Sequence, residues 1–233
     1  MSIFRALIAS ENGETPTPVL PTEYQEVEYI ATAGSQASNY AAYINTGVNP
    51  NANTKIDIDF AMVTAYSKNW TWMPIFGSRD NTYNDKSTYF ALYVYGKVNA
   101  TSGTVTENYA GADPGSSSTV YVNFGQRYNI KNNGGSFYLD DVYLPAISTT
   151  NVLVQSNQPI YLFDCNNLGS PQNRQHRTKI FKCKIYNGDT LIRDFVPCYK
   201  KSNNVIGFYD LVGSTFYTNS GTGYMERGSD VNA

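Results

Sequence analysis

The stretch IFKCKIYNGDTLIRDFVPCYKKSNNVIGFYDLVGSTFYTNSGTG, residues 180–223, carries the pattern that decides the fold. Apolar and polar residues alternate along it, and two short turn signals interrupt the alternation. The first signal, Asn187-Gly188-Asp189, allows the positive φ that a tight hairpin needs, and the second is Val212-Gly213-Ser214. We therefore predict two consecutive β-hairpins, with strands over Ile180–Tyr186, Thr190–Pro197, Val205–Leu211 and Thr215–Thr218.

The composition of the whole chain favours an all-β protein. The chain has 233 residues, of which 20 are tyrosines and only 15% are charged. Tyrosine and threonine favour strands, whereas the abundant glycine and asparagine favour turns. The formal net charge is −2 and no basic stripe occurs, so we expect no nucleic-acid partner. No apolar run approaches the ~20 residues that span a bilayer, so we expect no membrane insertion.

The segment Lys55–Val63 is the most regular predicted strand, with one apolar face and one mostly charged face. Roughly a dozen such segments, separated by turn signals about every ten residues, predict a jelly-roll sandwich of two antiparallel sheets. Gly96–Ser118 is predicted to be a long loop. The two faces of the regular strand are Ile56, Ile58, Phe60 and Met62, against Lys55, Asp57, Asp59 and Ala61.

The first residues read as an arm rather than as part of the sandwich. Ile3, Phe4, Leu7 and Ile8 can share one side of a short helix, which is marginal alone in water and therefore needs a surface to dock on. The three prolines of Glu11–Pro21 indicate an extended linker. Two interpretations stay open, a disordered tail and an anchor that inserts into a partner. The expected division is an arm and linker over 1–21 and a jelly-roll domain over 22–233.

The cysteines and the single histidine do not form a recognisable site. Cys165, Cys183 and Cys198 are odd in number and lack CxxC spacing, so we expect small buried hydrophobes rather than a zinc or redox centre. His176 lies in the polar stretch Gln172–Arg177 and is predicted to be a solvated loop residue.

Two long motifs resemble a known family. The opening segment Leu20–Phe60 begins LPTEYQEVEYI, and the second motif contains KIY, RDFVPC, IG, YD, FYTN and GTG within residues 184–223. Together they resemble the concanavalin A-like lectin/glucanase (LamG-like) domain of phage structural proteins and gut-bacterial surface proteins. The resemblance implies a jelly roll. It selects no single function, because members include virion fibre and decoration proteins and adhesins, and many proteins of this fold bind glycans.

The segment 70–85 is the candidate ligand-binding region. Sugars stack on aromatic rings and hydrogen-bond to Asn, Asp and Tyr side chains. Each tryptophan could instead pack against the core rather than bind a ligand, and for Trp72 core packing is the preferred interpretation. Asp80, Asn84 and Asp85 are also candidate Ca²⁺ ligands, without the glycine and glutamate of an EF-hand loop. The candidate glycan contacts are Trp70, Trp72, Asp80, Asn81, Tyr83 and Asn84.

No catalytic residues are predicted. Glycoside hydrolysis needs two carboxylates, and the resemblance implies a Glu-x-Asp-x-x-Glu strand in the glucanases of this fold. Asp57 and Asp59 share a strand face, but no glutamate accompanies them. Adjacent Arg193 and Asp194 face opposite ways, so we expect each to pair with a neighbouring strand.

The expected function is therefore that of a non-enzymatic phage virion protein, a head fibre, capsid decoration or tail-associated protein. It is expected on the virion surface after assembly in the host cytoplasm. The arm would bind other virion proteins and the sandwich would bind host-surface glycans, and homo-oligomers are common among such fibres. The alternatives are a glycan-active hydrolase with an atypical site and a bacterial surface adhesin.

Overall fold

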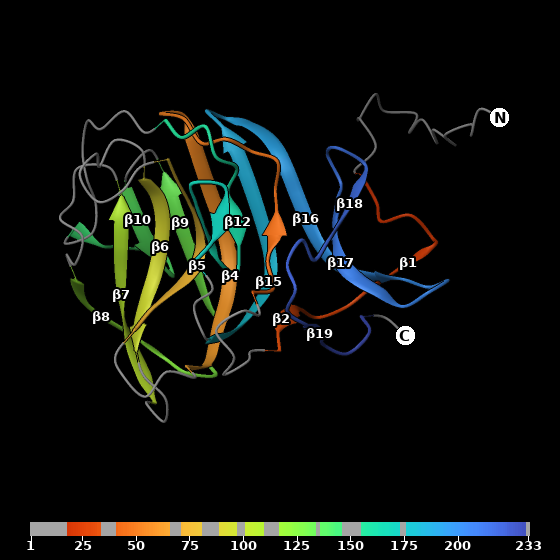
Figure 1. Cartoon of the computed structure of the whole chain (residues 1–233), viewed down its shortest axis with the longest axis horizontal. Helices are drawn as coiled ribbons and strands as arrows, with labels where there is room; N and C mark the ends of the chain where they lie inside the picture. Colours follow the sequence, from red (N-terminus) through yellow and green to blue (C-terminus); the bar gives the residue numbers. More distant parts are fainter. Residues whose placement is uncertain are drawn as a thin grey trace.

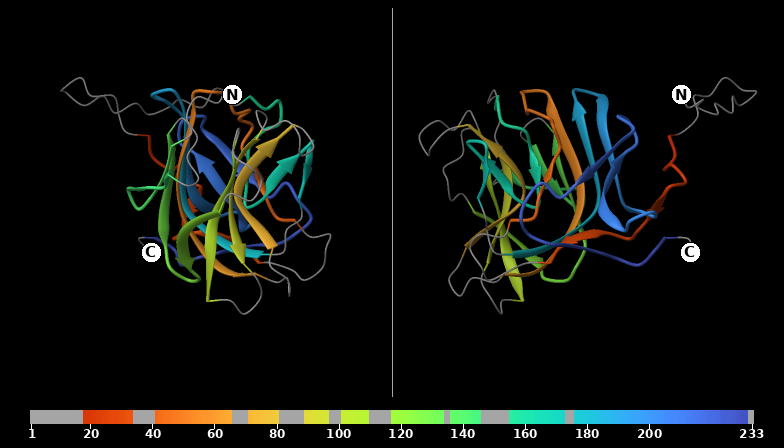
Figure 2. Two further views of the ribbon diagram at one scale, coloured as in Figure 1. Left: turned by 90° about the vertical axis from the view of Figure 1, so that its left-hand side faces the viewer. Right: turned by 45° about the vertical axis from the view of Figure 1, so that its right-hand side comes forward.

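The computed structural model has two β-sheets packed face to face (Figures 1 and 2). The predicted all-β jelly-roll sandwich is confirmed, and the described residues contain no α-helix. Within this part of the chain there is accordingly no helix long and apolar enough to cross a membrane. The structure describes residues 18–33, 41–65, 71–80, 89–96, 101–109, 117–133, 136–145, 155–172 and 176–231.

The larger sheet contains eleven of the strands in the described residues. Their bounds are β1 (Tyr24–Glu26), β2 (Ile30–Thr32), β4 (Thr54–Ala65), β9 (Tyr128–Asn133), β10 (Ser136–Leu139), β11 (Val142–Tyr143), β15 (His176–Asn187), β16 (Thr190–Lys200), β17 (Val205–Asp210), β18 (Thr215–Thr218) and β19 (Met225–Arg227). The main order is β11-β10-β9-β4-β15-β16-β17-β18. β1 pairs with β16, and β2 pairs with β15 and β19.

The smaller sheet contains the other eight described strands. They are β3 (Ile44–Asn45), β5 (Thr71–Arg79), β6 (Tyr89–Gly96), β7 (Ser102–Tyr109), β8 (Ser117–Asn123), β12 (Tyr161–Leu162), β13 (Cys165–Asn167) and β14 (Ser170–Pro171). The prediction of a loop over Gly96–Ser118 is wrong, because β7 lies within it and pairs with β6 and β8. β7 reads SGTVTENY, too polar to show the alternation that marks a half-buried strand.

The core lies between the two sheets and follows the alternation predicted for β4. Ile56, Ile58, Phe60 and Met62 are each at most 1% exposed, whereas Lys55 and Asp57 face outward. Phe76 and Phe90 of the smaller sheet pack into the same cluster. This interior is apolar and large enough to drive folding without metals or disulfides. The three cysteines are free and buried, as predicted.

The two predicted hairpins are confirmed as β15-β16 and β17-β18, and the pairing of β16 with β17 joins them into one antiparallel meander. In the first turn Gly188 has φ +60°, the left-handed conformation that the Asn-Gly signal predicts. In the second turn the residue with positive φ is Ser214, not Gly213. Gly213 is required for a different reason, because a Cβ there would lie 2.5 Å from Asp210 Oδ2.

Asp210 holds the second turn together from a fully buried position. Its Oδ1 accepts hydrogen bonds from the backbone N–H groups of Asp194 (2.9 Å) and Val212 (3.1 Å), and its Oδ2 accepts one from Gly213 (3.0 Å). Arg193 Nε lies 3.6 Å from the same carboxylate, while Asp194 pairs with Lys184 on β15 at 3.1 Å. Arg193 and Asp194 thus pair with different neighbouring strands, as predicted.

His176 is buried, and the prediction of a solvated loop residue is wrong. β15 begins at His176, four residues before the predicted strand, and the residue is 4% exposed. Its Nδ1 lies 2.8 Å from Thr178 Oγ1, whose hydroxyl is 3.1 Å from Met62 Sδ. Burial lowers the pKa of His176 to about 4, so the imidazole is neutral in the folded protein near neutral pH.

Asp210→Ala is expected to lower the free energy of unfolding by about 4 kcal/mol. It removes the acceptor of three N–H groups and leaves the Arg193 guanidinium without its buried partner. Urea unfolding measures the change. Asp189→Asn, in the exposed turn of the first hairpin, is the matched control and is expected to leave the midpoint unchanged. Equal shifts in the two variants would show that Asp210 has no special role.

The folded protein is expected to lose stability as the pH falls from about 6.5 to about 4. In that window the unfolded chain binds a proton at His176 and the folded chain does not. The free energy of unfolding therefore decreases as the pH is lowered, and His176 accounts for about 3 kcal/mol of this decrease. Urea unfolding of the wild type and of His176→Gln across this range isolates the contribution. The stability difference between the two proteins should change by that amount, and a constant difference would refute the assignment.

Candidate functional site

The outer face of the larger sheet carries charged side chains of alternating sign. The strand register aligns Lys131 of β9 with Asp57 of β4, Asp57 with Lys184 of β15, and Lys184 with Asp194 of β16. Cations and anions therefore alternate across four neighbouring strands, the arrangement in which cross-strand charge pairs are favourable. This row lies directly outside the apolar core, because successive side chains of each strand point to opposite faces.

Hydrogen bonds from β9 hold the two carboxylates of β4 in place. Asn129 Nδ2 donates to Asp57 Oδ1 and to Asp59 Oδ1, both at 2.6 Å. Asp59 is 8% exposed and also contacts Arg127 Nη2 at 2.5 Å and Lys182 Nζ at 3.8 Å. The carboxylates are thus held in place by hydrogen bonds and ion pairs before any ligand arrives.

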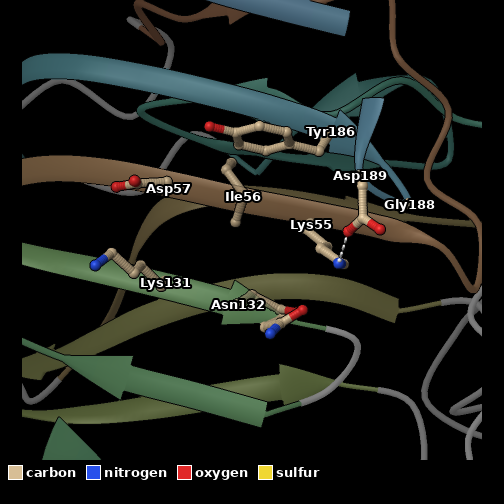
Figure 3. Close-up of a pocket in the computed structure, with 9 residues that line it drawn as sticks. Lys55, Ile56, Asp57, Lys131, Asn132, Tyr186, Gly188 and Asp189 are labelled. Atoms are coloured by element: carbon tan, nitrogen blue, oxygen red, sulfur yellow. Dashed lines mark hydrogen bonds and ion pairs between the residues drawn. The ribbon is translucent and has the colours of Figure 1, made fainter. Parts of the chain in front are cut away.

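A pocket of about 260 Å³ lies at one end of this face (Figure 3). The tight turn between β15 and β16 brings Asp189 to Lys55, 2.9 Å away. Figure 3 shows the Tyr186 ring along one side, with Asp57 and Lys131 on neighbouring strands. The described residues that line the pocket are Lys55, Ile56, Asp57, Lys131, Asn132, Asn133, Tyr186, Gly188 and Asp189.

Ion pairs at the rim favour the charged forms of Lys131 and Asp189. The hydrogen bond from Lys131 Nζ to Asp141 Oδ1, 2.6 Å long, raises the pKa of Lys131. The hydrogen bond from Lys55 lowers the pKa of Asp189. Both carboxylates are largely exposed, so a ligand can replace their contacts at small cost. The pocket is therefore lined by an aromatic ring, two carboxylates, two amides and two ammonium groups.

Two of the predicted glycan contacts lie elsewhere, on the smaller sheet. Trp72 is half-buried and packs edge-on to Tyr93, with the ring centroids 6.3 Å apart, beside Ala91 and Cys165. Phe90 and Leu92 alternate with these residues and face the core, so Trp72 packs on the outer face of that sheet.

Asp80 is engaged by the turn that precedes β12. Its Oδ1 accepts from Ser156 Oγ (2.6 Å) and the Gln158 N–H (3.0 Å), and its Oδ2 accepts from the Asn157 N–H (2.6 Å). These contacts account for the carboxylate without a metal or sugar. No group of three or more His, Cys, Asp or Glu side chains suited to a metal occurs among the described residues. The other predicted contacts, Trp70, Asn81, Tyr83, Asn84 and Asp85, lie outside the described residues and stay predictions.

Sequence reasoning did not find the pocket. Lys55, Lys131 and Tyr186 lie on three strands far apart in the chain, and only the pairing of β4 with β9 and β15 brings them together. The available signal was the charged outer face of β4, which alternation did reveal. In the sequence Tyr186 ends the KIY segment of the second motif, directly before the Asn-Gly turn, and neither feature marks it as a pocket residue.

Comparison with known proteins supports the fold. No family model matches the sequence, and no curated protein matches it. Among solved structures, the native heptameric SAP-like pentraxin from Limulus polyphemus aligns with a TM-score of 0.51. The alignment covers 88% of this chain and 95% of the pentraxin at 12% sequence identity. At that identity the likeness shows the fold alone, a concanavalin A-like jelly roll.

Asn129→Ala is expected to lower the free energy of unfolding by about 1–2 kcal/mol, because two neighbouring carboxylates lose their shared donor. The cost should fall in the Asp57→Asn background, where the repulsion between the carboxylates is already relieved. Urea unfolding of the two single variants and the double variant gives the coupling energy. Exposed Asn133→Ala is the control, and additive effects of Asn129→Ala and Asp57→Asn would contradict the bridging role.

Proposed function

We propose that this protein is a non-enzymatic glycan-binding protein displayed on a phage virion. The observation that carries the glycan-binding part is the pocket in which the Tyr186 ring lies beside Asp57, Lys131 and Lys55. A sugar ring has an apolar face that packs on an aromatic ring and hydroxyl groups that both donate and accept hydrogen bonds. Carboxylate, amide and ammonium groups around such a ring serve both roles.

The fixed position of Asp57 supports a role in ligand binding rather than a generally polar surface. Asp57 is fixed by the hydrogen bond from Asn129 Nδ2, which is 2.6 Å long. Lys131 and Lys55 are paired with exposed carboxylates that a ligand can displace. Side chains that are already ordered lose less conformational entropy when a ligand binds. The pocket also lies on strands of a large sheet, which position side chains more rigidly than loops do.

The virion role rests on the resemblance of Leu20–Gly223 to LamG-like domains of phage structural proteins. In this proposed role, the protein is a head fibre, capsid decoration or tail-associated protein at the virion surface. The arm, through Ile3, Phe4, Leu7 and Ile8, attaches it to other virion proteins; these residues lie outside the described ones. Three free cysteines suit assembly in a reducing host cytoplasm. Host-surface glycans are the proposed ligands, and neither nucleic acid nor membrane insertion is involved.

Tyr186→Ala is expected to weaken glycan binding at least tenfold, about 1.4 kcal/mol, because the stacking surface is lost. A glycan array identifies the ligand, and calorimetric titration measures the change in Kd. Tyr121→Ala is the control, because Tyr121 is an exposed tyrosine on β8 of the other sheet, away from the pocket. Equal binding by both variants would place the ligand elsewhere, with the segment around Trp70 as the next region to test.

The prediction that the protein is not an enzyme is tested with the glycan that it binds. Incubation of the protein with its array ligand is expected to release no reducing sugar. Turnover that Asp57→Asn or Asp59→Asn abolishes would instead establish a hydrolase with an atypical site.

Deletion of residues 2–20 is expected to abolish incorporation into virions while the sandwich still folds. Mass spectrometry of purified particles measures incorporation, and circular dichroism of the truncated protein checks the fold. Unchanged incorporation would rule out the arm as the anchor, and absence of the full-length chain from particles would rule out the virion role.

A further inference from the structure

A second pocket, of about 510 Å³, lies further along the same sheet. Tyr29 and Phe181 meet edge to face there, with ring centroids 5.5 Å apart. Lys179 Nζ lies 4.0 Å from the Tyr29 ring centroid, and the Arg127 guanidinium lies 4.4 Å from that of Phe181. The described residues that line it are Glu26, Val27, Glu28, Tyr29, Arg127, Lys179, Phe181 and Val231.

A β-bulge puts both pockets on one face of the sheet. Lys179 and Tyr186 are seven residues apart on β15, and in a regular strand an odd spacing places side chains on opposite faces. The register with β4 shifts between Ile180 and Lys182, which resets the alternation. Ile180 and Ile185 are accordingly both fully buried, whereas Lys179 and Tyr186 both face outward. From Phe181 to Tyr186 the strand advances about 17 Å.

Contacts between side chains join the two pockets. Asp57 lines the first pocket and is bound by Asn129, which also binds Asp59. Asp59 pairs with Arg127, and Arg127 stacks on Phe181 in the second pocket. The surface between the pockets is therefore an ordered polar network rather than a set of independent side chains.

The charges of the two pockets balance. The first has Lys55 and Lys131 against Asp57 and Asp189 among its described lining residues, and the second has Arg127 and Lys179 against Glu26 and Glu28. Most of these groups are already paired within the protein. A polyanion or polycation would meet an equal number of like charges, whereas an uncharged polyhydroxyl chain can hydrogen-bond to groups of both signs.

We propose that the two pockets and the network between them form one elongated site for an uncharged oligosaccharide. The chain runs along β15, with a sugar on Tyr186 at one end and a sugar against Tyr29 and Phe181 at the other. This inference rests on the proposed glycan binding and specifies its ligand class. It requires a ligand longer than a single sugar.

The test is calorimetric titration with uncharged gluco-oligosaccharides of α-1,4, β-1,4 and β-1,3 linkage, from disaccharide to octasaccharide. Affinity is expected to rise at least tenfold with length until both pockets are filled. Phe181→Leu and Tyr29→Leu should weaken binding of the longest ligand at least fivefold and leave binding of the shortest unchanged. Tyr186→Ala should weaken both. Lys179→Met serves as a further variant if either aromatic change lowers the urea midpoint, and Tyr121→Ala is the control.

The outcomes separate this inference from the proposed function. Glycan binding that is independent of length and insensitive to Phe181→Leu, Tyr29→Leu and Lys179→Met would overturn the elongated site and leave glycan binding intact. Preference for oligogalacturonates, with affinity that falls steeply as salt is added, would overturn the uncharged ligand class. No binding of any oligosaccharide in either set, and no hit on the glycan array, would overturn the proposed function itself.

Discussion

The antiparallel register between β4 and β15 is the constraint on which both faces of the larger sheet depend. It sets Ile58 beside Cys183 in the core and, one position away, Asp57 beside Lys184 on the outside. Because side chains alternate with a period of two, a slip of one residue would exchange the two sets. Burial of the apolar set makes such a slip very unfavourable. The packing of the core residues thus fixes the pattern of charges on the outer face of the sheet, although that face points away from the core.

The bulge at Phe181 is one of two places where the register between β4 and β15 shifts, and the other lies between Arg177 and Thr178. It adds a residue at Phe181 and so allows both halves of a twelve-residue strand to keep their apolar residues inside. Phe181 follows buried Ile180 and faces outward beside Arg127, and the shift turns Lys184 to the same outer side, where it meets Asp194. A packing requirement of the core therefore determines which side chains share the outer surface.

Local sequence pattern identified the strands with regular alternation, but not the polar strands or the arrangement of side chains on the surface. The alternation of β4 and the Asn-Gly turn at Gly188 identified strands correctly, because each signal lies within a few residues. β7 and the start of β15 at His176 were missed, since both segments are polar in sequence and become strands through the neighbours they pair with. The first pocket was missed for the same reason, because its side chains meet only through pairings between distant segments.

The residues that carry the family resemblance serve mainly the fold. Asp210, in the YD segment of the motif, accepts the hydrogen bonds that hold the second turn, and Arg193 packs against that carboxylate. Tyr186 is the exception, because it belongs to the motif and also lines the first pocket. Three of the charged residues that line the pocket with it, Lys55, Asp57 and Lys131, lie on the outer face of the sheet and outside the second motif. A likeness in the motif therefore predicts the sandwich, whereas the proposed glycan binding depends on side chains that the motif does not specify.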